Sequence, residues 1–140
     1  MCRKSGHNER MIEELRILGW AIVVGLVSVF TAAGLATHQR GLAWNAGNRD
    51  GEPIALTGAA ARAVRANANF LETFPFFAAA ILGVAAARAN TPHTLMGAEI
   101  YLWARVIYLP VYVVGIPYLR TLIWGVSLWG LLQVIEALFA

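Results

Sequence analysis

Cysteine is almost missing from this chain of 140 residues, where Cys2 is the single example. One thiol excludes an internal disulfide, and it leaves neither a redox pair nor the ligand spacing of a metal site, so we expect no bound metal. Charged residues are also scarce at 14%, well below the ~25% typical of soluble domains. The net charge of +3 contains no dense basic run, and we therefore expect no nucleic-acid partner.

Hydrophobic residues make up 59% of the chain and gather in four stretches. Each stretch is near or above the ~20 residues that cross a bilayer as a helix. They cover about residues 12–37, 57–88, 93–113 and 117–139, with a polar loop at 38–56. This pattern predicts an all-α, multi-pass membrane protein whose residues 1–140 form a single four-helix membrane domain. The first stretch is too long for the core of a signal peptide, so we interpret it as a mature helix.

Helix ends are indicated by local signals. Met11–Arg16 predicts the start of the first helix, with acidic residues in the first turn where the helix dipole favours them. Thr57 is a plausible N-cap for the second helix. Short turns around Pro92 and Pro117 predict that the last three helices are antiparallel neighbours.

The second apolar stretch contains polar side chains that need an explanation. Arg62, Arg65, Asn69 and Glu72 fall within roughly 80° of one another at about 100° per residue, so all four leave one face of the helix. An ionised group in hydrocarbon costs at least ~2.5–3.5 kcal/mol, which predicts that this stripe faces protein or water. Glu72 lies roughly 22 Å from the helix start, so it is deep and needs a cation or a proton.

A second polar stripe follows on the third helix, where four side chains project within about 60° of one another. They are Tyr101, Arg105, Tyr108 and Tyr112. Because chain direction alternates, the start of helix two, the end of helix three and the start of helix four share one side of the membrane. The topology therefore predicts one site at one depth, formed by Arg62, Arg65, Tyr108, Tyr112 and Arg120.

Several arginines beside tyrosines, an asparagine and one glutamate suit a small anion. Arginine forms bidentate pairs with carboxylates, and Glu72 could receive an ammonium group of the same ligand. A ligand with two carboxylates, an amine and a thiol matches these groups, and a nearby arginine favours the reactive thiolate. Two structural alternatives stay open: Glu72 pairs with Arg65 or Arg105 to lock helices together, or the tyrosines form an interfacial belt.

The motif Arg-x-x-Arg-Ala-x-x-Asn-x-x-Glu at residues 62–72, followed by Phe-Pro and by Arg-x-x-Tyr-x-x-x-Tyr at 105–112, resembles a known family. It is the family of membrane-associated proteins in eicosanoid and glutathione metabolism (MAPEG). The resemblance covers roughly residues 12–139, and residues 115–124 look like its bacterial branch. It implies a homotrimer in a bacterial inner membrane that uses glutathione as co-substrate in a transferase or peroxidase reaction on a small lipophilic electrophile.

The resemblance also implies roles for individual residues. Arg65, Asn69 and Glu72 match glutathione contacts, with Arg62 as a supporting group one turn earlier. Arg105, Tyr108 and Tyr112 match ligand-binding positions on the third helix. Arg120 resembles the thiolate-stabilising arginine, with Thr121 as its hydroxyl neighbour.

Two other functions stay open. A membrane scaffold or ligand-binding protein could keep the pocket without turnover, because Trp124 stands where some relatives have a tyrosine. A small transporter would also carry intramembrane arginines. The chain shows no inverted repeat, which argues against transport.

Overall fold

The computed structural model describes residues 2–140, with side chains described for residue 6 and residues 8–140. Its elements are α1 (Cys2–Arg40), α2 (Leu42–Ala46), α3 (Gly58–Ala87), α4 (Pro92–Val114) and α5 (Pro117–Glu136). Four of these helices are long and apolar enough to cross a membrane, and the described part of the chain contains no strand. The predicted all-α architecture with four spans is confirmed.

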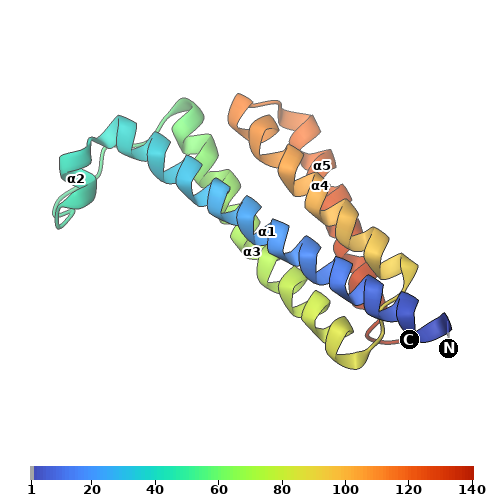
Figure 1. Ribbon diagram of the computed structural model, residues 1–140. Coiled ribbons are helices and arrows are strands. Elements are labelled where there is room, and N and C mark those ends of the chain that lie inside the picture. The colour runs from blue at the N-terminus through green and yellow to red at the C-terminus, as the bar shows by residue number, and fades with distance from the viewer. Residues whose placement is uncertain (1) are drawn as a thin grey trace.

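The long helices pack as two antiparallel pairs that lie against each other (Figure 1). α1 runs along α3, and α4 runs along α5. The start of α3, the end of α4 and the start of α5 lie at one end of the bundle, next to the loop that carries α2. Both chain termini and the turn from α3 to α4 lie at the opposite end.

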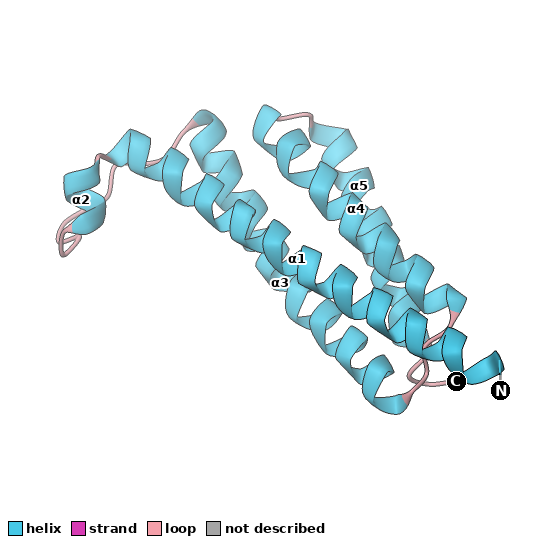
Figure 2. Cartoon of the chain, in the orientation of Figure 1, coloured by secondary structure: helices cyan, strands magenta, loops and turns pink. Residues whose placement is uncertain are grey.

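Tight turns join the last three helices (Figure 2). Arg88 ends α3 in the left-handed conformation, and a capping box opens α4, in which Thr91 and Thr94 each accept the other's backbone N–H at 3.1 and 2.9 Å. Gly115 ends α4 with φ of 94°, a conformation that glycine adopts without strain. These short connections make α4 antiparallel to both α3 and α5.

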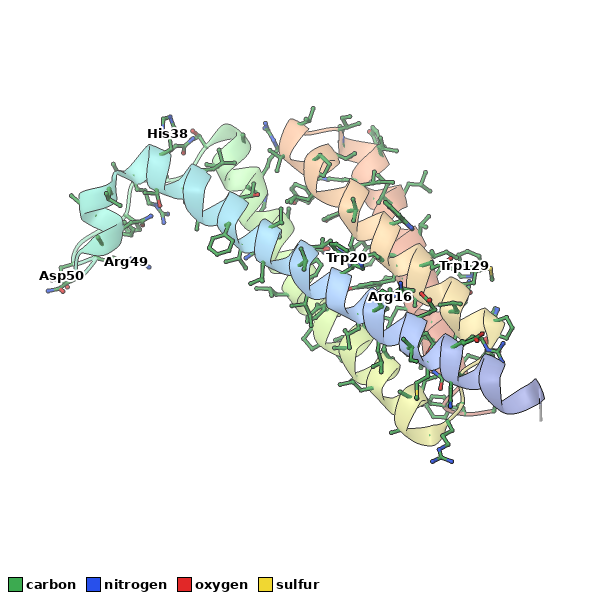
Figure 3. All side chains as sticks on the ribbon, viewed as in Figure 1. Arg16, Trp20, His38, Arg49, Asp50 and Trp129 are labelled. Atoms are coloured by element: carbon green, nitrogen blue, oxygen red, sulfur yellow. The ribbon has the colours of Figure 1, made fainter. Side chains whose placement is uncertain are left out.

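The core lies where α1, α3, α4 and α5 meet. Phe77 of α3 stacks on Tyr101 of α4 with ring centres 3.9 Å apart. α4 and α5 approach most closely at Gly97 and Gly130, where a Cβ on Gly97 would lie 2.7 Å from the carbonyl oxygen of Gly130. Large apolar side chains such as Trp20 and Trp129, labelled in Figure 3, are exposed on the outside, as expected for surfaces that face lipid.

One helix-end prediction was wrong and one was confirmed. α1 begins at Cys2, so Met11–Arg16 does not open the helix and no acidic residue lies in its first turn. Thr57 does occupy the N-cap of α3, but among the described residues its side chain makes no capping bond. Its backbone N–H and carbonyl pair with the side-chain amide of Gln39 at 3.0 Å each, which ties the start of α3 to the end of α1.

Candidate functional site

The first turn of α3 is fastened to the end of α4. Arg62 is half-buried and donates its Nε to the carbonyl oxygen of Val113 at 2.8 Å. Its guanidinium also lies against Gly115, where a Cβ would be 3.1 Å from Nε. Arg62 therefore brings α3 and α4 together at the depth that the topology predicts, and it does so by satisfying a carbonyl group at a helix end.

Asn69 is held one level deeper by Arg105. Arg105 is buried on α4 and donates to Asn69 Oδ1 at 2.8 Å and to Thr73 Oγ1 at 2.6 Å. The Thr73 hydroxyl in turn lies 3.3 Å from the Tyr101 hydroxyl. With its amide oxygen occupied by Arg105, Asn69 keeps its amide nitrogen for another acceptor.

An alternating row of guanidiniums and aromatic rings continues from Arg105 toward the end of α4. The guanidinium carbon of Arg105 lies 5.3 Å from the ring centre of Tyr108, and the Tyr108 and Tyr112 rings meet edge to face at 5.3 Å. The guanidinium of Arg120 on α5 then lies 4.8 Å from the centre of the Tyr112 ring. Such cation–π contacts orient a charge without neutralising it, so Arg120 stays available to an anion.

Arg65 and Glu72 differ from the other stripe residues because both are exposed on the single chain. The ion pairs among the described side chains join Glu13 to Arg16 and His93 to Glu136, so the alternative in which Glu72 pairs with Arg65 or Arg105 is not present. Both charges lie on a membrane-crossing helix, where contact with hydrocarbon is strongly unfavourable. A single protomer therefore leaves part of its polar stripe uncovered.

An apolar surface groove runs along one face of α5. Thr121 is exposed and faces this groove, and Trp124 is half-buried one turn further on. The groove is lined by Tyr118, Thr121, Leu122, Gly125, Val126 and Trp129. Arg120 is not among the lining residues, and at about 100° per residue it leaves a different face of α5.

A model of the MAPEG family matches residues 17–139. The chain belongs to the MAPEG family. This membership, together with the four long apolar helices, makes the chain an integral membrane protein of a family of glutathione-related transferases and related proteins. No curated protein and no solved structure matches it.

Within this MAPEG chain, the structure brings Arg62, Asn69, Arg105, Tyr108, Tyr112 and Arg120 into one connected region of α3, α4 and α5. Thr73 was missed by the sequence analysis, although it lies four residues after Asn69 on the same helix face. It links Asn69, Arg105 and Tyr101 into one hydrogen-bonded network.

A second polar cluster at the opposite end of the bundle was also missed. Glu14 is completely buried and accepts hydrogen bonds from Asn90 Nδ2 and from Thr94 Oγ1, the latter at 2.5 Å. The signal lay in the helical spacing, since residues 14, 17, 18 and 21 share one face and the last three are apolar. This cluster fixes α1 to the turn between α3 and α4.

Proposed function

We propose that this MAPEG protein is a glutathione-dependent enzyme of the transferase or peroxidase type that acts on lipophilic electrophiles within a bacterial inner membrane. Family membership supports this class of function. The observation that carries the proposal is the placement of Arg120 on the Tyr112 ring, at the end of a row of arginines and tyrosines that reaches Asn69 on α3. One connected region thus offers cationic and polar groups for a charged thiol peptide.

Glutathione has a charge pattern that these residues complement. A carboxylate pairs with the guanidinium of Arg65, and the ammonium group pairs with Glu72, because both side chains are exposed and without an ion-pair partner among the described residues. The free amide nitrogen of Asn69 donates to a peptide carbonyl, and Tyr108 and Tyr112 line the pocket. Arg62 and Arg105 support the pocket from beneath, since their guanidiniums already bond to the protein.

The pocket is completed by other copies of the chain. Arg65 and Glu72 are exposed on a membrane-crossing helix, and burial against a neighbouring protomer would remove them from lipid. We propose a homotrimer in which glutathione binds between protomers and phospholipid surrounds the remaining apolar surface. The proposed ligand then pairs with Arg65 and Glu72, which would otherwise be buried between protomers without a partner.

Arg120 supplies the chemical step in this proposal. Its guanidinium stabilises the thiolate of glutathione, whose proton passes to water, and the hydroxyl of Thr121 can donate a second hydrogen bond. The thiolate sulfur attacks an electrophilic carbon of a lipophilic molecule that arrives from the bilayer, so an S–C bond forms while the leaving group departs with its electron pair. Tyr112 keeps Arg120 in place for this role.

Thiolate spectroscopy on the purified oligomer tests the proposed function. We expect glutathione to produce the ultraviolet absorbance of a thiolate and to be conjugated to a lipophilic aryl halide. Arg120→Gln should retain glutathione binding but lose the thiolate signal and about a hundredfold in conjugation rate. The control Arg88→Gln alters an exposed arginine at the opposite end and should behave as wild type.

The same experiment distinguishes the enzyme from a non-catalytic member of the family. A wild-type protein that binds glutathione but produces neither thiolate absorbance nor conjugate, with several classes of electrophile including hydroperoxides, would be a scaffold or ligand-binding protein. That result would overturn the proposed catalytic role of Arg120 and Thr121 while leaving the pocket intact.

A further inference from the structure

The loop between α1 and α3 contains an ordered group of two arginines and one tryptophan. The guanidinium carbons of Arg40 and Arg49 lie 5.0 and 5.8 Å from the ring centre of Trp44, which belongs to the short helix α2. We call Arg40, Trp44 and Arg49 the loop cluster. It lies outside the glutathione pocket proposed above, on the part of the chain that projects from the bundle (Figure 2).

Hydrogen bonds hold the loop cluster in place. Arg40 donates Nε to the carbonyl oxygen of Ile54 at 2.9 Å, which joins the two ends of the loop. Arg49 adopts the left-handed conformation and donates Nε and Nη2 to the carbonyl oxygen of Asn45 at 3.2 and 3.1 Å. The side chain of Asn45 is bonded to Thr37 on α1. The two guanidiniums are therefore positioned by the fold.

The charges of the loop cluster are not neutralised within the described part of the chain. Both guanidinium carbons lie near one indole ring, so they are at most about 11 Å apart and repel each other. Asp50 and Glu52 belong to the same loop, but neither forms an ion pair with Arg40 or Arg49 among the described side chains. Figure 3 shows Asp50 at the outermost tip of the loop. An anion bound between the two arginines would remove this repulsion.

The position of the loop cluster indicates where that anion comes from. The cluster follows the last turn of a membrane-crossing helix, at the end of the bundle where α3 and α5 begin (Figure 1). Tryptophan is typical of the membrane–water interface. Leu42 and Ile54 beside it are 73% and 62% exposed, so the loop presents apolar side chains and guanidiniums together. An anionic phospholipid offers acyl chains and a phosphate in the same arrangement.

We propose that the loop cluster binds the headgroup phosphate of an anionic phospholipid. Arg40 and Arg49 donate to the phosphate oxygens, Trp44 packs at the level of the glycerol, and Leu42 and Ile54 insert among the upper acyl carbons. The bound lipid anchors the loop in the interface, on the side of the membrane where the glutathione pocket opens.

Native mass spectrometry of the oligomer, released from bilayers of equal amounts of phosphatidylglycerol and phosphatidylcholine, tests this proposal. We expect the wild type to retain phosphatidylglycerol preferentially. The double variant Arg40→Gln with Arg49→Gln should lose this preference by about tenfold or more, because each arginine near a headgroup contributes to anionic-lipid binding. Arg88→Gln is a matched control, since Arg88 is also an exposed, left-handed arginine but lies at the opposite end.

A lysine pair separates loss of charge from loss of loop structure. Arg40→Lys with Arg49→Lys keeps both charges and should restore most of the preference for phosphatidylglycerol. Unchanged lipid retention in the glutamine pair, or no restoration in the lysine pair, would overturn the proposal. It would also be overturned if the glutamine pair instead dissociated the oligomer or abolished glutathione binding, because the cluster would then be a protomer contact or part of the pocket.

Discussion

Arg105 connects the two polar helices of the site while lying beneath its surface. Its side chain is 1% exposed, and its two terminal nitrogens bond to Asn69 and Thr73 on α3. The rings of Tyr101 and Tyr108 lie within 5.4 Å of its guanidinium carbon. Arg105 therefore acts by positioning Asn69. Its hydrogen bond occupies the amide oxygen and leaves the amide nitrogen for a ligand.

Replacing Arg105 by methionine tests this positioning role. The change keeps an unbranched stem but removes the guanidinium, which leaves Asn69 Oδ1 and Thr73 Oγ1 without their donor, so we expect the free energy of unfolding to fall by about 1.5–3 kcal/mol. Glutathione affinity should fall as well, because Asn69 is released. Unfolding in mixed micelles and calorimetric titration measure the two effects. Equal stability and affinity of variant and wild type would show that the network does not position Asn69.

Individual residues of the site were predictable where spacing alone decides the geometry. The stripe of α3 and the stripe of α4 do meet, at Asn69 and Arg105, because residues three and four apart share a helix face. The partner of Glu72 was not predictable, since a carboxylate with two arginines within reach has several possible contacts. The structure selects none of them within one chain.

At the scale of the helix, Glu14 shows how a polar group can fix an apolar element. Its carboxylate bonds to Asn90 and Thr94 at the start of α4, where the helix dipole also favours a negative group. Gln39 ties the other end of α1 to Thr57, and the α1 residues of the core between these two points make apolar contacts. The buried bonds of Glu14 define the register of α1 against the turn between α3 and α4.

A comparison of Glu14→Ala with Glu13→Ala tests whether Glu14 sets the register of α1. Removal of the carboxylate leaves the amide of Asn90 without its acceptor, whereas Thr94 Oγ1 still lies 2.9 Å from the carbonyl oxygen of Thr91, so we expect a loss of about 1–3 kcal/mol in the free energy of unfolding. Glu13→Ala is the control, because Glu13 is exposed and, among the described side chains, bonds only to Arg16 on the same helix. The measurement is unfolding of each variant in mixed micelles. A similar effect of both substitutions would contradict the assignment.

The four spans were predictable because length and hydropathy are properties of the sequence. Their ends were harder to predict, as α1 shows by starting at Cys2. Polar residues before the first span continue the helix because no proline or sharp turn interrupts them. α2 was missed within the polar loop, since five residues are too few to carry a periodic signal.

At the scale of the whole molecule, the two ends of the bundle differ in kind. The end with Glu14 has a closed polar cluster whose bonds lie within one chain. The other end exposes Arg65 together with Thr121, beside a connected row of arginines and tyrosines. Glu72 is exposed further along the same α3 stripe. The Glu14 cluster is satisfied within one chain and requires no partner. Exposed charges on a membrane-crossing helix require a partner that shields them from lipid. This contrast supports a trimer whose contacts and ligand lie along α3.

Calorimetric titration of glutathione into the detergent-purified oligomer tests the central claim most directly. We predict that wild type and Arg88→Ala bind with equal affinity, whereas Arg65→Ala and Glu72→Ala each lose at least about tenfold, because each removes a charge-assisted hydrogen bond. The oligomer mass should be that of a trimer in all four proteins. Wild-type affinity in both Arg65→Ala and Glu72→Ala would contradict the assignment of the α3 stripe to the glutathione pocket.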